Sequence, residues 1–220
     1  MHDDSLKQQL LEVTAGLVDR EGPARITLRD VAAAAGTSTT AVYALFGGKS
    51  QLLTAVMDYG FRSFRESQEQ AAHGGLQGLG IAYRTWALEH PALYRLMFGG
   101  AMAAYADCKP SPEAAAGAMD PLIGAVSAAQ AAGALRAAPA ELVAVAIWAQ
   151  VHGLMSLELD QMGPPDAPWR TSTAWPSTPL AAAGPPDRPT FRPGNPPALR
   201  TLPDAGQILA RQVMCASNTV

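Results

Sequence analysis

The sequence has few cysteines, few aromatic residues and no excess of positive charge. Its 220 residues include only two cysteines, Cys108 and Cys215, which are too few for a disulfide framework or a cysteine-based metal site. We therefore expect a reduced, cytoplasmic location. The formal net charge is −3, and residues 1–66 hold seven Lys/Arg against eight Asp/Glu. Any affinity for DNA must therefore come from a few well-placed cations, hydroxyls and backbone amides.

Motifs for catalysis and metal binding are also missing from the sequence. We find no nucleophile elbow with Ser, Asp and His in order, no phosphate-binding glycine loop after a strand, and no paired metal-ligand motif. The four histidines, at positions 2, 73, 90 and 152, have no chelating spacing. We predict that the protein is not an enzyme and uses no cofactor and no metal.

A membrane partner is not expected either. The N-terminus is polar and acidic, unlike a signal peptide. The longest apolar run, residues 142–159, contains Gln150, His152 and Glu158, which a membrane span of about 20 residues does not normally carry. We interpret this run as a buried helix.

Alanine is abundant, and apolar residues make up 48% of the chain. This composition favours closely packed helices around a real core, in one domain or two. Apolar residues at helical spacing predict helices over residues 5–20, 50–72, 79–90, 91–98, 120–132 and 139–159. The sequence therefore predicts an all-α fold.

The most informative stretch is residues 27–46, TLRDVAAAAGTSTTAVYALF. Thr27 is a good N-cap for a first short helix, and Asp30 three residues later approaches the capping-box pattern. Gly36 can adopt the positive φ that ends such a helix. Two short helices joined through a glycine turn are the usual means of placing the second helix in a DNA major groove.

The second helix of this stretch is capped by Thr37 or Ser38, two residues that can each accept the first amide hydrogen bond. Its spacing divides the side chains into an inward set, Val42, Leu45 and Phe46, and an outward set, Thr39, Thr40 and Tyr43. Because the N-terminal residues of a recognition helix read base edges, the outward set is a candidate DNA-binding surface.

These residues resemble the start of the TetR/AcrR family of bacterial transcriptional regulators. The matching positions are Thr27, Val31-Ala32, Ala35-Gly36, Ser38, Tyr43 to Phe46, and Lys49. The segments 83–99 and 148–159 are similar to the ligand domain of one branch, marked by Trp148, His152 and Gly153. The resemblance implies a DNA-binding regulator, most simply a repressor, that acts as a homodimer on a palindromic operator and senses a small molecule.

This reading divides the chain into four segments. We expect a three-helix, helix-turn-helix DNA-binding domain over residues 1–50, with a connecting helix starting over 50–72, and a helical ligand-binding and dimerisation domain over 73–162. Twelve of the 18 prolines follow between Pro164 and Pro203, so we expect a disordered, irregular linker over 163–203. A candidate terminal helix covers 204–216, shorter than the final helix of the family.

The DNA-binding candidates are Thr27, Arg29, Ser38, Thr39, Thr40, Ala41, Tyr43 and Lys49. Thr39 and Thr40 can offer hydroxyl and methyl groups to bases, and Ala41 can contact a thymine methyl. Thr27 can present its hydroxyl and helix N-terminal amides to a phosphate, and Arg29 can reach the backbone or the groove edge. The resemblance implies that Tyr43 and Lys49 hold phosphates. The alternative for the two threonines is an ordinary solvent-facing role.

The ligand-binding candidates are Trp86, Tyr94, Met97, Phe98, Met102, Trp148, His152 and Met155. A pocket with this lining would suit an apolar or aromatic molecule. Aromatic and methionine residues at helical spacing are more often core than pocket, so that reading stays open for each of them. Two other functions also stay open: a helical ligand-binding protein without DNA binding, and an interaction module whose proline-rich tail docks a partner.

Overall fold

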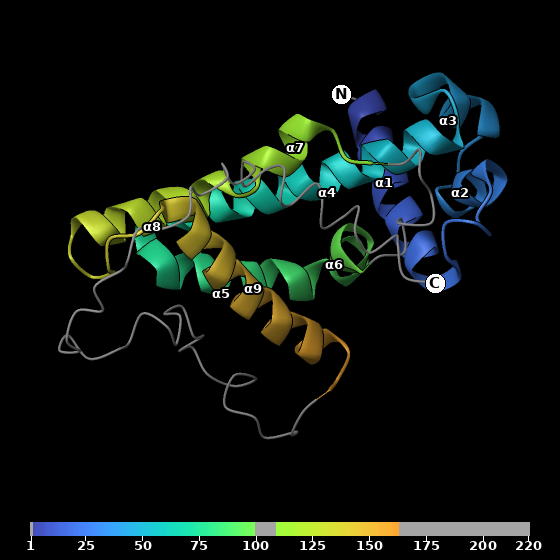
Figure 1. Ribbon diagram of the computed structural model, residues 1–220. Helices are drawn as coiled ribbons and strands as arrows, with labels where there is room; N and C mark the ends of the chain where they lie inside the picture. The colour runs from blue at the N-terminus through green and yellow to red at the C-terminus, as the bar shows by residue number, and fades with distance from the viewer. Residues whose placement is uncertain (1, 100–108, 163–220) are drawn as a thin grey trace, which may run out of the picture.

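The computed structural model describes residues 2–99 and 109–162, and all regular structure within them is helical (Figure 1). The elements are α1 (His2–Glu21), α2 (Leu28–Ala34), α3 (Thr39–Phe46), α4 (Lys49–Ala71), the 3-10 turn η1 (Ala72–Gly74), α5 (Gly75–Glu89), α6 (Pro91–Phe98), α7 (Pro112–Gly117), α8 (Asp120–Ala131) and α9 (Ala140–Leu159). The predicted all-α class is confirmed. The expectations for residues 163–203 and 204–216 lie outside the described residues.

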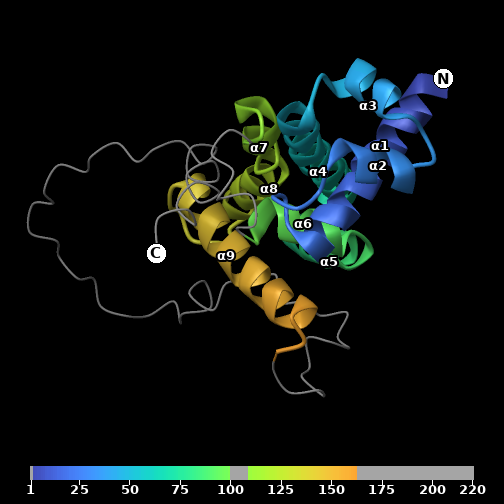
Figure 2. The same ribbon diagram turned by 90° about the vertical axis from the view of Figure 1, so that its right-hand side faces the viewer.

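The long helix α4 connects the two ends of the molecule. Helices α1, α2 and α3 gather around its N-terminal end, and α5, α8 and α9 lie around its far half (Figures 1 and 2). Helix α6 packs against both α1 and α4, between these two groups. Helix α6 therefore connects α1, the first helix of the N-terminal group, to the C-terminal group.

The core follows the apolar stripe of α4. Leu52, Leu53, Val56, Met57 and Phe61 are completely buried along it, at the helical spacing that the sequence indicated. They belong to one continuous apolar cluster that extends from α1 to α9. A continuous core makes the N-terminal helices and the C-terminal helices mechanically coupled.

Two helices begin several residues earlier than the sequence-based prediction. Helix α1 begins at His2 instead of residue 5, and α5 begins at Gly75 instead of residue 79. At Gly78 a Cβ atom would come within 2.7 Å of the Ala71 carbonyl oxygen. The glycines that suggested a loose connection therefore allow α5 to start close against the end of α4.

Helix α7 was not predicted, although its start signal is present in the sequence. Ser111 caps it by accepting a hydrogen bond from the Ala114 amide at 3.3 Å, and Pro112 takes the first helical position. The Ser111 amide donates to the Asp58 carboxylate at 2.7 Å, which attaches the cap to α4. The helix has only six residues, too few to show an apolar period.

Helix α9 is long and apolar enough, by length and composition alone, to cross a membrane. A core helix passes the same test, so this finding is weak evidence for a span. The bidentate ion pair of Glu158 with Arg84 on α5, at 2.8 and 2.5 Å, attaches α9 to the rest of the helical domain. The expectation of a buried helix is right for one face only, because just 28% of the apolar window is buried.

Candidate functional site

The turn between α2 and α3 is fixed by caps on both sides. The Thr27 hydroxyl accepts a hydrogen bond from the Asp30 amide at 3.2 Å, and the Asp30 carboxylate accepts one from the Thr27 amide at 2.9 Å. At the other end of α2 the Thr37 amide donates to the Ala32 carbonyl at 2.9 Å. Gly36 between them has a φ of +64°, which side-chain-bearing residues rarely adopt. The capping box and the glycine stop predicted from the sequence are confirmed.

Helix α3 presents one buried and one exposed face. Of the two caps considered, Ser38 is the one used: its hydroxyl accepts a hydrogen bond from the Ala41 amide at 3.1 Å. Val42 and Phe46 are buried, which attaches the helix to the core. Tyr43 is 56% exposed. Since a buried tyrosine would leave no surface for a partner, this exposure keeps α3 available to DNA.

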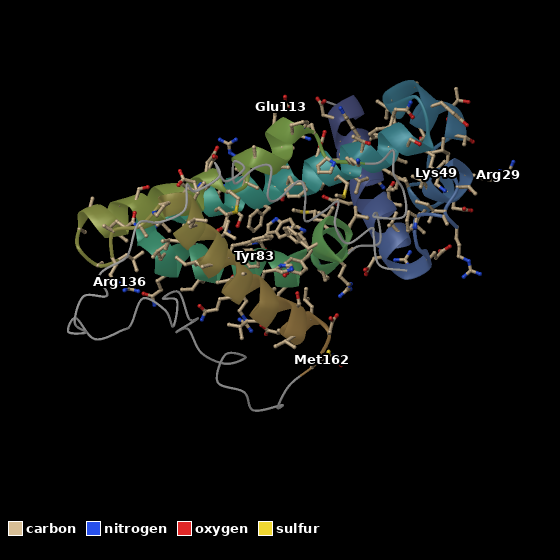
Figure 3. All side chains as sticks on the ribbon, in the orientation of Figure 1. Arg29, Lys49, Tyr83, Glu113, Arg136 and Met162 are labelled. Carbon is tan, nitrogen blue, oxygen red and sulfur yellow. The ribbon has the colours of Figure 1, made fainter. Side chains whose placement is uncertain are left out.

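An open hollow brings together five of the eight predicted DNA-binding residues: Thr27, Arg29, Thr39, Tyr43 and Lys49. Arg29 projects from this end of the molecule (Figure 3). Hydroxyl groups and cations converge in the hollow, and these are the groups that bind phosphate oxygens. The remaining three candidates lie on the first turn of α3, where Thr40 is exposed, Ala41 is half-buried and the Ser38 hydroxyl serves as the cap.

The charge around the hollow differs from the charge of the whole chain. Lys49 donates a hydrogen bond from Nζ to the Ala24 carbonyl at 3.2 Å, which fixes its amine at the rim. Arg25, which the sequence analysis did not select, is exposed between two residues that line the hollow. Hydrogen bonds from Thr27 lower the pKa of the Asp30 carboxyl, so this group stays ionised. Two cations, Arg29 and Lys49, and one carboxylate, Asp30, thus line the hollow, and Arg25 is exposed next to it in the chain.

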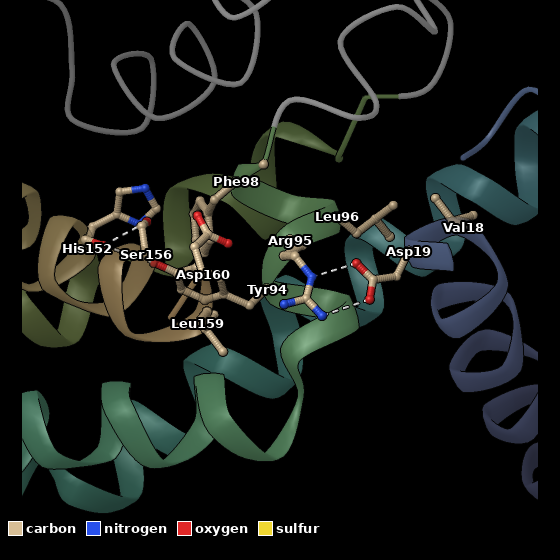
Figure 4. A pocket seen from close by; sticks show the side chains of 11 residues that line it. Val18, Asp19, Tyr94, Arg95, Leu96, Phe98, His152, Ser156, Leu159 and Asp160 are labelled. Carbon is tan, nitrogen blue, oxygen red and sulfur yellow. Dashed lines mark hydrogen bonds and ion pairs between the residues drawn. The ribbon is translucent and has the colours of Figure 1, made fainter. Parts of the chain in front are cut away.

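A second concave feature lies between α1, α6 and α9. It is a cavity of about 320 Å³ whose lining includes three predicted ligand-binding residues, Tyr94, Phe98 and His152 (Figure 4). Helix α1 contributes Val18 and Asp19 to the same wall. The cavity therefore touches the N-terminal group of helices as well as the C-terminal group, which the sequence analysis did not anticipate.

His152 is the centre of a polar cluster at this cavity. Its Nδ1 lies 2.7 Å from the Tyr94 hydroxyl and 3.1 Å from the Tyr83 hydroxyl. Burial lowers the pKa of His152 and raises the pKa of both tyrosines, so all three groups are neutral at pH 7. A neutral tyrosine hydroxyl donates to Nδ1 or accepts from it, according to which ring nitrogen carries the proton. Tyr83 was not among the sequence candidates because it reads as an ordinary core position.

The other predicted ligand-binding residues have different surroundings. Trp86 donates from Nε1 to the Ser63 hydroxyl at 3.0 Å and is buried against Phe64. Met97 and Met155 are likewise buried in the apolar cluster. These three are core residues, as their helical spacing allowed. Trp148 lines a smaller space between α4, α5, α8 and α9, and Met102 lies outside the described residues.

An ion pair at the cavity wall joins α1 to α6. Arg95 donates from Nε to Asp19 Oδ1 at 2.7 Å and from its terminal amine to Oδ2 at 2.9 Å. The two residues are 76 positions apart in the sequence. No local pattern marks either residue, so sequence reasoning could not have paired them.

Comparison with known proteins gives two matches to family models. Residues 10–56 match the model described as bacterial regulatory proteins, tetR family. Residues 76–174 match the model described as tetracyclin repressor-like, C-terminal domain. Together the two models cover both groups of helices. No match to a protein of curated function was found.

Solved structures share the fold over most of their length. A protein of unknown function from Rhodococcus sp. RHA1 is 29% identical, covers 73% of this chain and 87% of its own, and superposes with a TM-score of 0.61. A regulatory protein, SCO4313, is 25% identical with 79% and 91% coverage and a TM-score of 0.58. A tetR family transcription regulator from Shewanella sp. PV-4 is similar in fold, at 21% identity, 76% and 89% coverage and a TM-score of 0.59.

Proposed function

The chain belongs to the TetR family of transcriptional regulators, and from this premise we propose that it is a ligand-responsive repressor that binds a palindromic operator as a homodimer. Membership makes it a DNA-binding regulator and not an enzyme. Such a protein acts in the cytoplasm, where the DNA is. The observation that carries the proposal is the exposed face of α3 beside a hollow lined by hydroxyls and cations.

In this proposal α3 is the recognition helix. Thr39, Thr40 and Ala41 on its first turn contact base edges, and Tyr43 and Lys49 contact phosphates. Helix α3 has no Arg, Asn or Gln for bidentate base readout. Discrimination between operators therefore comes from threonine and methyl contacts, helped by DNA shape.

Phosphate contacts on α2 complete this face. Thr27 and Arg29 are both exposed at the N-terminal end of α2. Arg25, Arg29 and Lys49 supply the local positive charge that a chain of net charge −3 lacks overall.

The second copy of the chain covers the outer faces of α8 and α9. On α9 the exposed positions that follow Glu141 are apolar or small and recur at helical spacing: Leu142, Ala146, Ala149, Gly153 and Leu157. Leu142 and Leu157 are 43% and 40% exposed, and a Cβ at Gly153 would meet nothing within 4 Å. An apolar helix of which only 28% is buried by its own chain needs a partner surface. A two-fold partner would set the two α3 helices about 34–36 Å apart, the spacing of successive major grooves.

We assign the effector site to the cavity between α1, α6 and α9. The Trp-His-Gly branch that the sequence resembles is marked by Trp148, His152 and Gly153. The Trp148 and His152 rings lie 5.4 Å apart, and His152 lines the cavity. An effector that prefers a different separation of the two α3 helices lowers operator affinity by its differential affinity for the two states.

The test of this proposal has two steps. The full chain first selects the fragments of genomic DNA that it binds, and its affinity for a selected fragment is then measured by titration. Thr40→Ala and Tyr43→Phe should each weaken binding to the selected operator by about 1–3 kcal/mol. Both side chains are exposed, so neither change should alter the unfolding transition. Unchanged operator affinity in both variants would refute the role of α3. Selection of no preferred sequence would point instead to a ligand-binding protein that does not read DNA.

A further inference from the structure

The cavity between α1, α6 and α9 is lined by three charged side chains whose charges do not sum to zero. Arg95 lies between the carboxylates of Asp19 and Asp160 (Figure 4). Asp19 takes both hydrogen bonds of the guanidinium, at 2.7 and 2.9 Å. The Asp160 carboxylate has no hydrogen bond or ion pair within residues 2–99 and 109–162, although it is close enough to raise the pKa of Arg95. The lining therefore carries one uncompensated negative charge.

Aromatic rings form the wall next to this charge. The Tyr94 and Phe98 rings lie 5.1 Å apart, the Phe98 and His152 rings 5.1 Å, and the Tyr94 and His152 rings 5.5 Å. Because burial keeps His152 neutral, the imidazole adds no positive charge. Aromatic faces attract cations, and a carboxylate beside them adds a direct partner.

We propose that the effector of this cavity is a hydrophobic organic cation. Its ammonium group pairs with Asp160, and its apolar part lies against Tyr94 and Phe98. The cavity, about 320 Å³, is at the small end of the range for small-molecule sites, so the ligand is compact. The inference rests on the proposed function, because it names the chemical class of the effector of that same site.

An anionic effector fits this lining less well. Among the described residues that line the cavity, the one cation is Arg95, which already binds Asp19 through two hydrogen bonds. An anion would have to displace Asp19 and would also meet the like charge of Asp160. A cation neutralises Asp160 without breaking any contact described here. Because Asp19 belongs to α1, a ligand in this cavity lies directly beside the helix that supports the DNA-binding unit.

The test uses three probes that share a phenylalkyl chain and differ in the polar group at its end, which is positive, neutral or negative: 4-phenylbutylammonium, 4-phenylbutan-1-ol and 4-phenylbutanoate. Their affinities for the full chain without DNA are measured by titration calorimetry. We expect the ammonium to bind at least about tenfold more tightly than the alcohol, the difference that about 1.4 kcal/mol gives, and the carboxylate to bind most weakly.

Variants identify the residue responsible for this order. Asp160→Asn should bring the ammonium and the alcohol to within about threefold of each other, a difference below 1 kcal/mol, and Asp160→Glu should retain the preference for the ammonium. Glu66→Gln is the matched control, since it removes one exposed carboxylate from α4, away from the cavity. Thermal melting of each variant excludes a folding defect as the cause.

Three results would overturn the inference: tightest binding of the carboxylate, a preference for the ammonium that survives Asp160→Asn, or binding of none of the probes. A gel shift with the selected operator keeps the proposed function separate. If the chain binds the operator and 4-phenylbutanoate releases it, the proposal of a repressor stands and the proposal of a cationic effector is refuted. If the chain binds no operator but its preference for the ammonium depends on Asp160, the proposal of a cation site stands and the proposal of a repressor is refuted.

Discussion

The ion pair of Asp19 with Arg95 should couple the DNA-binding helices to the effector cavity. We propose to break it with Asp19→Asn, which keeps the shape of the side chain and removes its charge. The Arg95 side chain is 41% exposed and the Asp19 side chain 19%. Exposed pairs contribute about 0.2–1 kcal/mol, whereas breaking a buried pair costs about 3–5 kcal/mol. Solvent screening at Arg95 puts this bidentate pair near the upper end of the exposed range, at about 1 kcal/mol.

The assay is a double-mutant cycle of Asp19→Asn, Arg95→Gln and the double variant in urea unfolding. We expect a coupling energy of about 1 kcal/mol in the free energy of unfolding. If the operator-binding arrangement needs this contact, Asp19→Asn should also weaken operator binding, by up to about fivefold per subunit, because 1.4 kcal/mol corresponds to a factor of ten.

The matched control is Glu158→Gln, which breaks the bidentate pair with Arg84 between α5 and α9. That pair does not touch α1, so the variant should lose stability while operator affinity stays the same. Additive effects of Asp19→Asn and Arg95→Gln, or an equal loss of operator affinity in Glu158→Gln, would refute the reasoning.

Two further predictions concern His152 and the outer face of α9. Burial holds the pKa of His152 below its ordinary value of 6.5, so as the pH falls the unfolded chain binds a proton at this residue before the folded chain does. Below about pH 6.5 the free energy of unfolding should therefore drop more steeply for the wild type than for His152→Gln. Urea titrations from pH 7.5 to 5 check this, and parallel curves would contradict it. Ala149→Asp places a charge on the exposed face of α9 and should give monomers in light scattering with weaker operator binding, whereas an intact dimer would exclude α9 from the interface.

Local chemistry determined the DNA-binding end of this protein. The cap at Thr27, the turn at Gly36 and the exposed side of Tyr43 each follow from residues within a few positions of one another. Helical spacing and capping are short-range properties, so the sequence alone was sufficient to predict this unit and its family. The same short-range reasoning identified α9 as an apolar helix, but it could not tell which face of α9 its own chain would leave exposed.

Tertiary structure decided which residues line the cavity between α1, α6 and α9, the proposed effector site. The sequence predicted one pocket lined by all of the aromatic, methionine and histidine candidates. In the structure Tyr94, Phe98 and His152 line the cavity, whereas Trp86, Met97 and Met155 are buried in the apolar core. Every one of these residues has the same apolar helical pattern, so spacing cannot distinguish the wall of a cavity from the core.

The charged residues around the cavity could not be grouped from the sequence at all. Asp19 lies on α1, Arg95 on α6 and Asp160 directly after the end of α9, and no local signal relates them. They meet because α6 packs between α1 and the C-terminal helices, and that docking depends on contacts between residues far apart in the chain. The sequence therefore determined which helix carries the exposed face proposed to bind DNA, whereas long-range packing decided which side chains surround the proposed effector cavity.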